Sequence, residues 1–290
     1  MAWLQLKLPC TNIQAEQLSD LLFELSAVSV TFEDAEDTPI FEPKPGTMPL
    51  WAHTNVIALF EEDADLVTVY AVLQNRFPEI FQHHILERVE DQAWEKAYFD
   101  SFQPIKIANN LWICPTWHKP PEPHATNIML DPGVAFGTGT HPTTQLCLQM
   151  LSETDLANKT VIDYGCGSGI LAIAALKLGA QKVVAVDIHE QALEATEQNA
   201  STNELLDKII ICHPDKLTNE PVDVIVANIL AEPLIKLAGT IIRLLKPQGQ
   251  LILSGLLTEQ SDEVKKAYKI LTLQAEKIMD EWCCLSFLKR

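Results

Sequence analysis

The stretch DYGCGSG, residues 163–169, places Gly165, Gly167 and Gly169 directly after the apolar, strand-like run TVI. A second cluster lies upstream in LDPGVAFGTGTHPTT (130–144), so six of the 11 glycines in this 290-residue chain fall within 37 positions. Glycine costs roughly 0.5–1 kcal/mol relative to alanine in regular structure, so this crowding indicates unusual backbone conformations or close approach to a ligand. One such cluster could be an ordinary tight turn, but two clusters flanked by regular strand and helix patterns favour a ligand-binding site.

Strand-like and helix-like segments alternate after an expected hairpin at 105–117. The strands are rich in valine and isoleucine without polar alternation, which is typical of a parallel sheet covered by helices on both faces. Two last strands near 271–288 have no helix between them and must pair as a hairpin, so one of them runs antiparallel to the rest. The sequence therefore predicts a Rossmann-like α/β domain with a seven-stranded, mostly parallel sheet. The other strands are expected at 160–165, 182–188, 208–213, 222–229 and 250–257, and helices at 168–179, 190–200, 232–246 and 261–269.

The first 90 residues follow a different order, in which the segments read strand, helix, strand, strand, helix, strand. WLQLKL (3–8) alternates apolar and polar residues, and AEQLSDLLFELS (15–26) carries leucines at helical spacing. The order β-α-β-β-α-β predicts a small α+β domain of the ferredoxin-like type over residues 1–90. Residues 91–103 are expected to form an amphipathic linker helix, and residues 104–290 the larger domain.

The net charge of −18 argues against non-specific binding to nucleic acid, which requires a cationic surface. The charge is uneven, because residues 1–102 hold 18 acidic and 5 basic side chains, whereas residues 103–290 hold 21 acidic and 16 basic ones. This excess of acid could serve solubility alone. It also predicts that the first third of the chain faces a basic partner.

The seven cysteines include no C-x-x-C pair, which favours neither a disulfide framework nor a zinc site, and no metal site is expected. The N-terminus MAWLQLKLPC lacks the pattern of a secretory signal, and no apolar run approaches the ~20 residues that span a bilayer. His83 and His84 are adjacent and are interpreted as surface or turn residues. These features predict a cytoplasmic protein that does not bind a membrane.

The glycine loop does not fit the common phosphate-binding patterns. A dinucleotide-binding G-x-G-x-x-G would need glycine where Ile170 stands, and no G-K-[ST] follows. The remaining pattern, D-x-G-x-G-x-G, resembles the cofactor loop of class I S-adenosylmethionine-dependent methyltransferases. Asp187 ends the second strand, where an acid can accept hydrogen bonds from ribose hydroxyls, and Asn228 ends the fourth strand beside the same crevice.

The stretch LDPGVAFGTGTHPTT resembles, nearly letter for letter, the signature of the bacterial methyltransferase family that acts on protein eleven of the large ribosomal subunit. The segments EPKPG, LWICPTW, VVAVDI, VANILA and DEW extend the likeness over the whole chain. The resemblance implies methyl transfer from S-adenosylmethionine to lysine ε-amino groups and the N-terminal α-amino group of that ribosomal protein, up to trimethylation. It also implies that the small N-terminal domain recognises the ribosomal protein, free or during ribosome assembly, and that the glycine segment closes over the cofactor and substrate.

The same resemblance assigns cofactor contacts to Thr144 in HPTT, Gly165 in the glycine loop, Asp187 and Asn228, and the loop geometry adds Gly167. No catalytic acid or base is assigned, because a neutral amine is already a good nucleophile and positioning with exclusion of water suffices. Asn228 is the candidate for positioning the amine. Methyltransferases that act on planar nitrogen often carry N-P-P-Y here, whereas this chain has N-I-L-A, which fits a flexible aliphatic amine.

The residues before the first helix of the larger domain leave further interpretations open. His141 could act as a base, although packing at the start of that helix is the interpretation we favour. Thr140 is expected to cap the helix, with Pro142 in its first turn. Gly137 and Gly139 are interpreted as hinges of a moving loop.

Two other functions share these features. A methyltransferase of another basic protein or of a small amine would carry the same cofactor residues. A non-catalytic, methyltransferase-like binding module would be expected to lose the acid or a loop glycine, and Asp187 and the glycines are all present.

Overall fold

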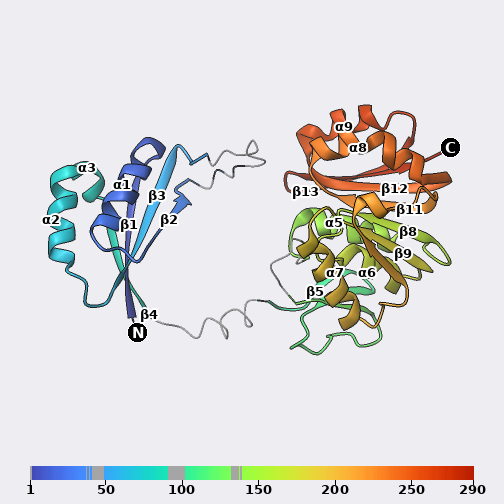
Figure 1. The fold of residues 1–290 in the computed structure, drawn as a ribbon, viewed down its shortest axis with the longest axis horizontal. Helices are drawn as coiled ribbons and strands as arrows, with labels where there is room; N and C mark the ends of the chain where they lie inside the picture. Colours follow the sequence, from blue (N-terminus) through green and yellow to red (C-terminus); the bar gives the residue numbers. More distant parts are fainter. Residues whose placement is uncertain are drawn as a thin grey trace. The chain divides into compact units, whose positions relative to one another are not determined.

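The computed structural model describes residues 2–36, 38, 40, 49–90, 102–131, 137 and 139–290. The chain divides into two compact units, Met1–Tyr98 and Phe99–Arg290, whose elements are drawn in Figure 1. The predicted linker helix, 91–103, and the EPKPG connection fall almost wholly outside the described residues.

The N-terminal unit is built on a four-stranded antiparallel sheet in the order β2-β3-β1-β4. Alternate residues of the first strand, such as Leu6 and Leu8, are fully buried and pack with Leu18, Leu22 and Leu73 from the helices. The strict alternation places the polar residues of the same strand on the opposite face of the sheet. The elements are β1 (Ala2–Thr11), α1 (Asn12–Glu24), β2 (Ser29–Asp34), β3 (His53–Glu61), α2 (Leu66–Arg76), α3 (Pro78–Phe81) and β4 (Ile85–Glu90).

The C-terminal unit contains a seven-stranded sheet in the order β10-β9-β8-β11-β12-β14-β13. All neighbouring pairs up to β12 are parallel, whereas β14 is antiparallel to both of its neighbours, as predicted for the final hairpin. The strands are β8 (Thr160–Tyr164), β9 (Lys182–Val186), β10 (Ile209–Cys212), β11 (Val222–Asn228), β12 (Leu245–Leu257), β13 (Thr272–Met279) and β14 (Trp282–Leu288).

Helices cover both faces of this sheet (Figure 1). One apolar core packs one face of the sheet against α5, α6 and α7. A second core packs the other face against α8 and α9. The central strands β8 and β11 are buried on both sides, which explains their valine- and isoleucine-rich composition and confirms the predicted α/β fold. The helices are α5 (Pro142–Ser152), α6 (Ile170–Lys177), α7 (Glu190–Thr202), α8 (Ala231–Leu244) and α9 (Ser261–Ala267), and short helices η1 (Pro214–Lys216) and η2 (Thr258–Gln260) complete the set described.

A small three-stranded sheet precedes α5 and packs on the first core. Its strands β5 (Ile105–Ala108) and β6 (Leu111–Cys114) form the predicted antiparallel hairpin, and β7 (Thr126–Met129) runs parallel to β6. No helix among the described residues is both long and apolar enough to cross a membrane.

Two local predictions are wrong. The residue that caps α5 is His141, whose side chain accepts a hydrogen bond from the backbone N–H of Thr143, so Thr140 lies one residue too early. The helix predicted at 232–246 ends at Leu244, because the chain turns directly into β12, which starts five residues before the predicted strand. Pro142 does occupy the first turn of α5, as predicted.

Candidate functional site

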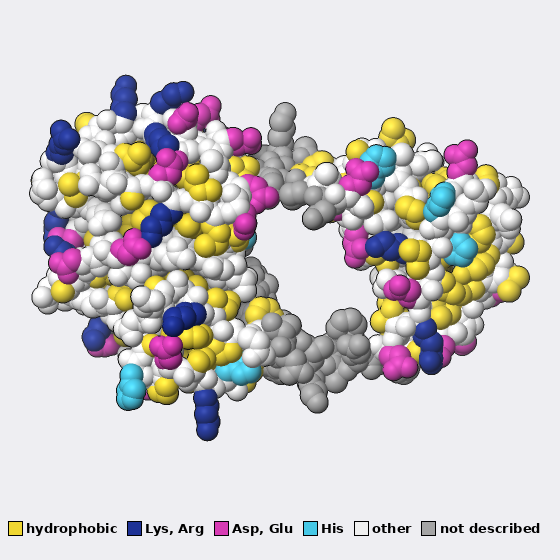
Figure 2. Space-filling view, turned by 180° about the vertical axis from the view of Figure 1, so that it is seen from behind, with side chains coloured by type: hydrophobic (Ala, Val, Ile, Leu, Met, Phe, Trp, Pro, Cys, Tyr) yellow, Lys and Arg dark blue, Asp and Glu magenta, His cyan; other side chains and the backbone are white. Residues whose placement is uncertain are grey.

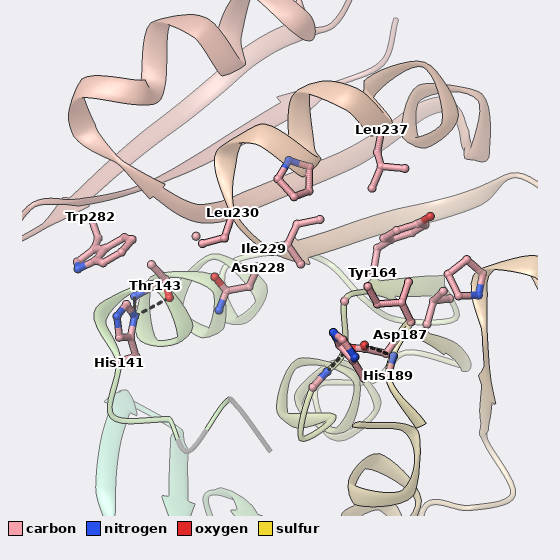
Figure 3. A pocket seen from close by; sticks show the side chains of 17 residues that line it. His141, Thr143, Tyr164, Asp187, His189, Asn228, Ile229, Leu230, Leu237 and Trp282 are labelled. Atoms are coloured by element: carbon pink, nitrogen blue, oxygen red, sulfur yellow. Dashed lines mark hydrogen bonds between the residues drawn. The ribbon is translucent and has the colours of Figure 1, made fainter. Parts of the chain in front are cut away.

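A cavity of about 620 Å³ lies at the carboxyl ends of β8, β9 and β11. These three strands are neighbours in the sheet, and the strand order reverses between β8 and β11. Ligands of open α/β folds bind at this kind of switch point. Of the five predicted cofactor residues, Gly165, Gly167, Asp187 and Asn228 line the cavity and Thr144 does not. Asp187 and Asn228 are labelled in Figure 3.

The glycine loop follows β8 and adopts left-handed backbone conformations. The φ angles of Gly165, Gly167 and Gly169 are +83°, +53° and +79°. A Cβ atom on Gly165 would lie 2.2 Å from Cγ2 of Ile229, which is far inside van der Waals contact. The backbone conformation therefore favours glycine at all three positions, and at Gly165 the narrow gap between the loop and the segment after β11 requires it as well.

Asp187, directly after β9, holds this loop in place. Its Oδ2 accepts a hydrogen bond from the backbone N–H of Gly167 at 3.0 Å, and its Oδ1 accepts one from the N–H of His189 at 3.0 Å. Each carboxylate oxygen has two lone pairs, so both oxygens retain the capacity to accept a further hydrogen bond from a ligand.

Asp163, the last-but-one residue of β8, was not predicted as a site residue. Its side chain is fully buried, and its Oδ2 accepts a hydrogen bond from the backbone N–H of Ala172 in the first turn of α6 at 2.9 Å. Its Oδ1 has no partner among the described residues. The pKa of Asp163 is raised to about 7, mainly by burial and also by the neighbouring charge of Asp187, while the hydrogen bond from Ala172 acts in the opposite direction. The pattern D-x-G-x-G-x-G contains this acid, but its raised pKa can be inferred only from its burial in the folded protein.

Asn228 ends β11 and lies between the two ends of the cavity. Its Nδ2 donates a hydrogen bond to Oγ1 of Thr144 at 3.3 Å, and its Oδ1 is buried with no partner in the described part of the chain. Thr144 is fully buried on α5, so in this structure it supports Asn228 rather than lining the cavity. The predicted contact of Thr144 with a cofactor stays a prediction.

The second end of the cavity is formed by His141, Thr143, Leu230 and Trp282 (Figure 3). His141 Nδ1 lies 2.7 Å from Oγ1 of Thr143, and the imidazole meets the Trp282 ring edge to face, with centroids 4.8 Å apart. Burial lowers the pKa of His141 below its usual value, which favours the neutral ring. These contacts agree with a role in helix-start packing.

Sequence reasoning did not predict Trp282 as a site residue, although the DEW segment was noted as part of a resemblance. Trp282 begins β14, more than a hundred residues after the glycine clusters, and no local spacing connects it to them. Only the pairing of β14 with β12, in which Trp282 lies opposite Leu257, brings it to the cavity.

Gly137 and Gly139 lie beside residues that the structure does not describe. The carbonyl oxygen of Gly137 accepts a hydrogen bond from Oγ of Ser168 at 2.7 Å, which connects the upstream glycine stretch to the glycine loop. Whether these glycines act as hinges stays a prediction.

Comparison with known proteins agrees with this arrangement. The family model described as "Ribosomal protein L11 methyltransferase (PrmA)" matches residues 2–290. The ribosomal protein L11 methyltransferase of Actinobacillus pleuropneumoniae serotype 5b is 50% identical over 293 aligned residues, which cover 100% of each chain. That of Vibrio cholerae serotype O1 is 51% identical over 291 aligned residues, which cover 99% of this chain and 98% of the relative.

A solved structure extends the likeness to three dimensions. The crystal structure of ribosomal protein L11 methylase from Lactobacillus delbrueckii subsp. bulgaricus is 35% identical and superposes with a TM-score of 0.61. It covers 65% of this chain and 100% of the other. On the full-length match to the family and to its relatives, the chain belongs to the ribosomal protein L11 methyltransferase family.

Proposed function

We propose that this protein transfers methyl groups from S-adenosylmethionine to lysine ε-amino groups and the N-terminal α-amino group of ribosomal protein L11, up to trimethylation. The observation that carries the proposal is the meeting of the glycine loop, Asp187 and Asn228 around one cavity at the switch point of the sheet. The family's name indicates the substrate, and the cavity contains the residues that would bind a methyl donor and position an amine.

The cavity fits the proposed cofactor at the end formed by the glycine loop. Asp187 would accept hydrogen bonds from the ribose hydroxyls, and the backbone at Gly165 and Gly167 would approach the methionine part. The apolar side chains of Leu237 and Pro233, from α8, would cover the flat base. The bound cofactor supplies an electrophilic methyl group on a sulfonium.

The chain's own contribution is to orient a neutral amine and exclude water. The unpartnered Oδ1 of Asn228 would accept a hydrogen bond from the amine and direct its lone pair towards the methyl group. The side chain of His141 already caps the start of α5 by accepting a hydrogen bond, and it is not required as a base. In N-I-L-A, Leu230, 49% exposed, stands at the second proline of N-P-P-Y and Ala231 at its tyrosine, so the rigid proline-aromatic clamp is replaced by side chains that suit an aliphatic amine.

The N-terminal unit is proposed to recognise the basic ribosomal protein. Its element order and its sheet order β2-β3-β1-β4 support a ferredoxin-like domain over residues 1–90, joined by residues 91–103 to the methyltransferase domain 104–290. Acidic side chains are scattered over the visible face of this smaller unit, with few Lys or Arg side chains among them (Figure 2). We place the reaction in the cytoplasm, on L11 that is free or entering the ribosome, without direct contact to nucleic acid.

The decisive experiment is mass spectrometry of purified L11 before and after incubation with the protein and S-adenosylmethionine. We expect a series of mass increases of one methyl group each, and no such series with an Asn228→Ala variant at the same concentration. A small-amine methyltransferase would leave L11 unchanged while consuming cofactor with free amines. A non-catalytic binding module would bind the cofactor without producing S-adenosylhomocysteine.

A further inference from the structure

The labelled side chains of the cavity fall into two groups (Figure 3). Tyr164, Asp187 and Leu237 lie towards the proposed cofactor end, whereas His141, Leu230 and Trp282 lie at the opposite end. Asn228 lies between the groups. Because the amine must approach the methyl group from the side away from the cofactor's sulfur, the second group forms the acceptor end.

The acceptor end has polar groups that can form hydrogen bonds and apolar groups that can only pack against a substrate. The Oδ1 of Asn228 is an acceptor without a partner among the described residues, whereas Nδ1 of His141 is already engaged with Thr143. The indole of Trp282 and the side chain of Leu230 provide apolar surface. An incoming amine at this end therefore meets the Asn228 side chain, which lines the cavity, and the aromatic ring of Trp282.

Successive methylation changes which of these groups can hold the amine. A neutral primary amine has two N–H bonds, a monomethylamine of the same side chain has one, and a dimethylamine has none. Asn228 Oδ1 can accept a hydrogen bond from the first two substrates but not from the third. The third substrate can be oriented only through contacts with its methyl carbons.

Trp282 is placed to make those contacts. It is the first residue of β14 and is paired with Leu257 of β12 and Met279 of β13, so its backbone is fixed on both sides. The edge-to-face contact with His141, at an interplanar angle of 68°, fixes the ring as well. A fixed aromatic face packs against the methyl carbons of a neutral dimethylamine, and its quadrupole attracts the alkylammonium group that forms from it.

In the third transfer the aromatic face of Trp282 can also stabilise the positive charge that develops on the amine nitrogen. The nitrogen lone pair forms the new C–N bond while the C–S bond breaks and its electron pair stays on sulfur, so the positive charge moves from sulfur to nitrogen. No proton leaves, because the dimethylamine nitrogen carries none, and the product is a quaternary ammonium ion. The charge that develops on nitrogen in this step is of the kind that aromatic faces stabilise.

We propose that Trp282 is the residue that determines completion of methylation, by holding the dimethylamine at the acceptor end where Asn228 no longer can. This inference rests on the proposed function, and it assigns separate steps to the two side chains. Asn228 serves mainly the first and second transfers, and Trp282 serves the third.

The test uses the full chain with Trp282→Leu and Trp282→Phe, and L11 as the substrate in two forms. One form is unmodified, and the other is dimethylated chemically with formaldehyde and a hydride donor, so that only the third transfer remains. Intact-mass time courses follow each form, and calorimetry with S-adenosylmethionine reports cofactor binding independently of turnover.

For Trp282→Leu we expect the third transfer to slow by about tenfold or more, which corresponds to about 1.4 kcal/mol. The first transfer should stay within a few-fold of wild type, and cofactor affinity should be unchanged. Trp282→Phe should recover most of the third transfer, which also gives a result if the Leu variant does not fold. Asn228→Ala also removes a proposed cofactor contact, so its three transfer rates are compared at saturating cofactor. Under that condition the loss should be concentrated in the first two transfers.

Equal rates of the third transfer in wild type and Trp282→Leu would overturn the inference, as would an equal loss in all three transfers with cofactor affinity intact. A Phe variant that stops at dimethylated product would also contradict it, since Phe retains an aromatic face. Failure of the wild-type protein to methylate unmodified L11 would instead overturn the proposed function itself.

Discussion

The Oδ2 atom of Asp187 accepts a hydrogen bond from the backbone N–H of Gly167 at 3.0 Å, which ties the end of β9 to the loop that follows β8. The acid at the second strand therefore shapes the glycine loop before any ligand binds. The same carboxylate lies in the cavity, so one side chain connects the conformation of the loop to the proposed recognition of a ribose.

Asp187→Ala should weaken binding of S-adenosylmethionine strongly. The substitution removes hydrogen bonds to a charged acceptor, each of which contributes roughly 1.5–3 kcal/mol, so we expect affinity to fall at least about tenfold. Titration calorimetry measures the change. Glu194→Ala, at an exposed acid on α7, is the matched control and should bind as wild type does. An Asp187→Ala protein with undiminished affinity would rule out the proposed cofactor site.

Asp163 should make the stability of the C-terminal unit fall as pH rises. Its pKa is about 7 in the folded protein against 3.8 for the unperturbed side chain, so the folded state holds a proton that the unfolded state releases. Stability from this group is fully present below pH 4 and is lost as pH rises through 7, with a slope of about 1.4 kcal/mol per pH unit in that window.

Urea unfolding of wild type and Asp163→Asn between pH 4 and 8 tests this expectation. Asparagine retains an acceptor for the N–H of Ala172 but does not titrate, so the difference in unfolding free energy between the two proteins should grow in favour of the variant as pH rises. Glu194→Gln, which removes an exposed carboxylate on α7, is unfolded in parallel as the matched control. A difference independent of pH would mean that Asp163 titrates at an ordinary value.

Turnover on lysine should rise between pH 7 and pH 9 in wild type and in His141→Asn alike. The free ε-amine has a pKa near ~10.4, so its neutral fraction grows about tenfold per pH unit over this range. Asparagine can cap α5 as histidine does, so the variant should keep its fold. Steady-state rates at saturating cofactor measure both profiles. A rise in wild type that disappears in the variant would make His141 a base after all.

A fragment of residues 99–290 should separate cofactor binding from substrate recognition. The fragment contains the whole cavity and follows the boundary between the two compact units. We expect calorimetry to give cofactor affinity within a few-fold of the intact chain, and mass spectrometry to show that most methylation of L11 is lost. Equal rates on L11 for fragment and full chain would show that residues 1–98 are not the recognition unit.

The order of elements in both units could be predicted from the sequence because it depends on local patterns. Alternation in β1 and uninterrupted apolar runs in β8, β9 and β11 follow directly from which faces are buried. The ends of elements were less predictable. His141 rather than Thr140 caps α5 because an imidazole nitrogen can accept a backbone hydrogen bond as a hydroxyl does, and the sequence pattern does not distinguish the two.

The site was predictable where a residue stands at a strand end and not where it acts through tertiary packing. Asp187 and Asn228 lie where the strand pattern places them, beside the glycine loop. The burial of Asp163 depends on how tightly α6 covers β8, and the position of Trp282 depends on the register of β14 with β12. Thr144 was assigned by resemblance alone, and its contact with Asn228 crosses 84 residues of sequence.

The place of β14 within the sheet has a consequence for biosynthesis. This strand lies between β12 and β13 rather than at an edge, so β12 keeps an unpaired border until Trp282–Leu288 has left the ribosome. An open border of buried apolar strand is a site for wrong pairing with other chains. The sheet and its aromatic wall are therefore completed together, when β14 pairs with β12.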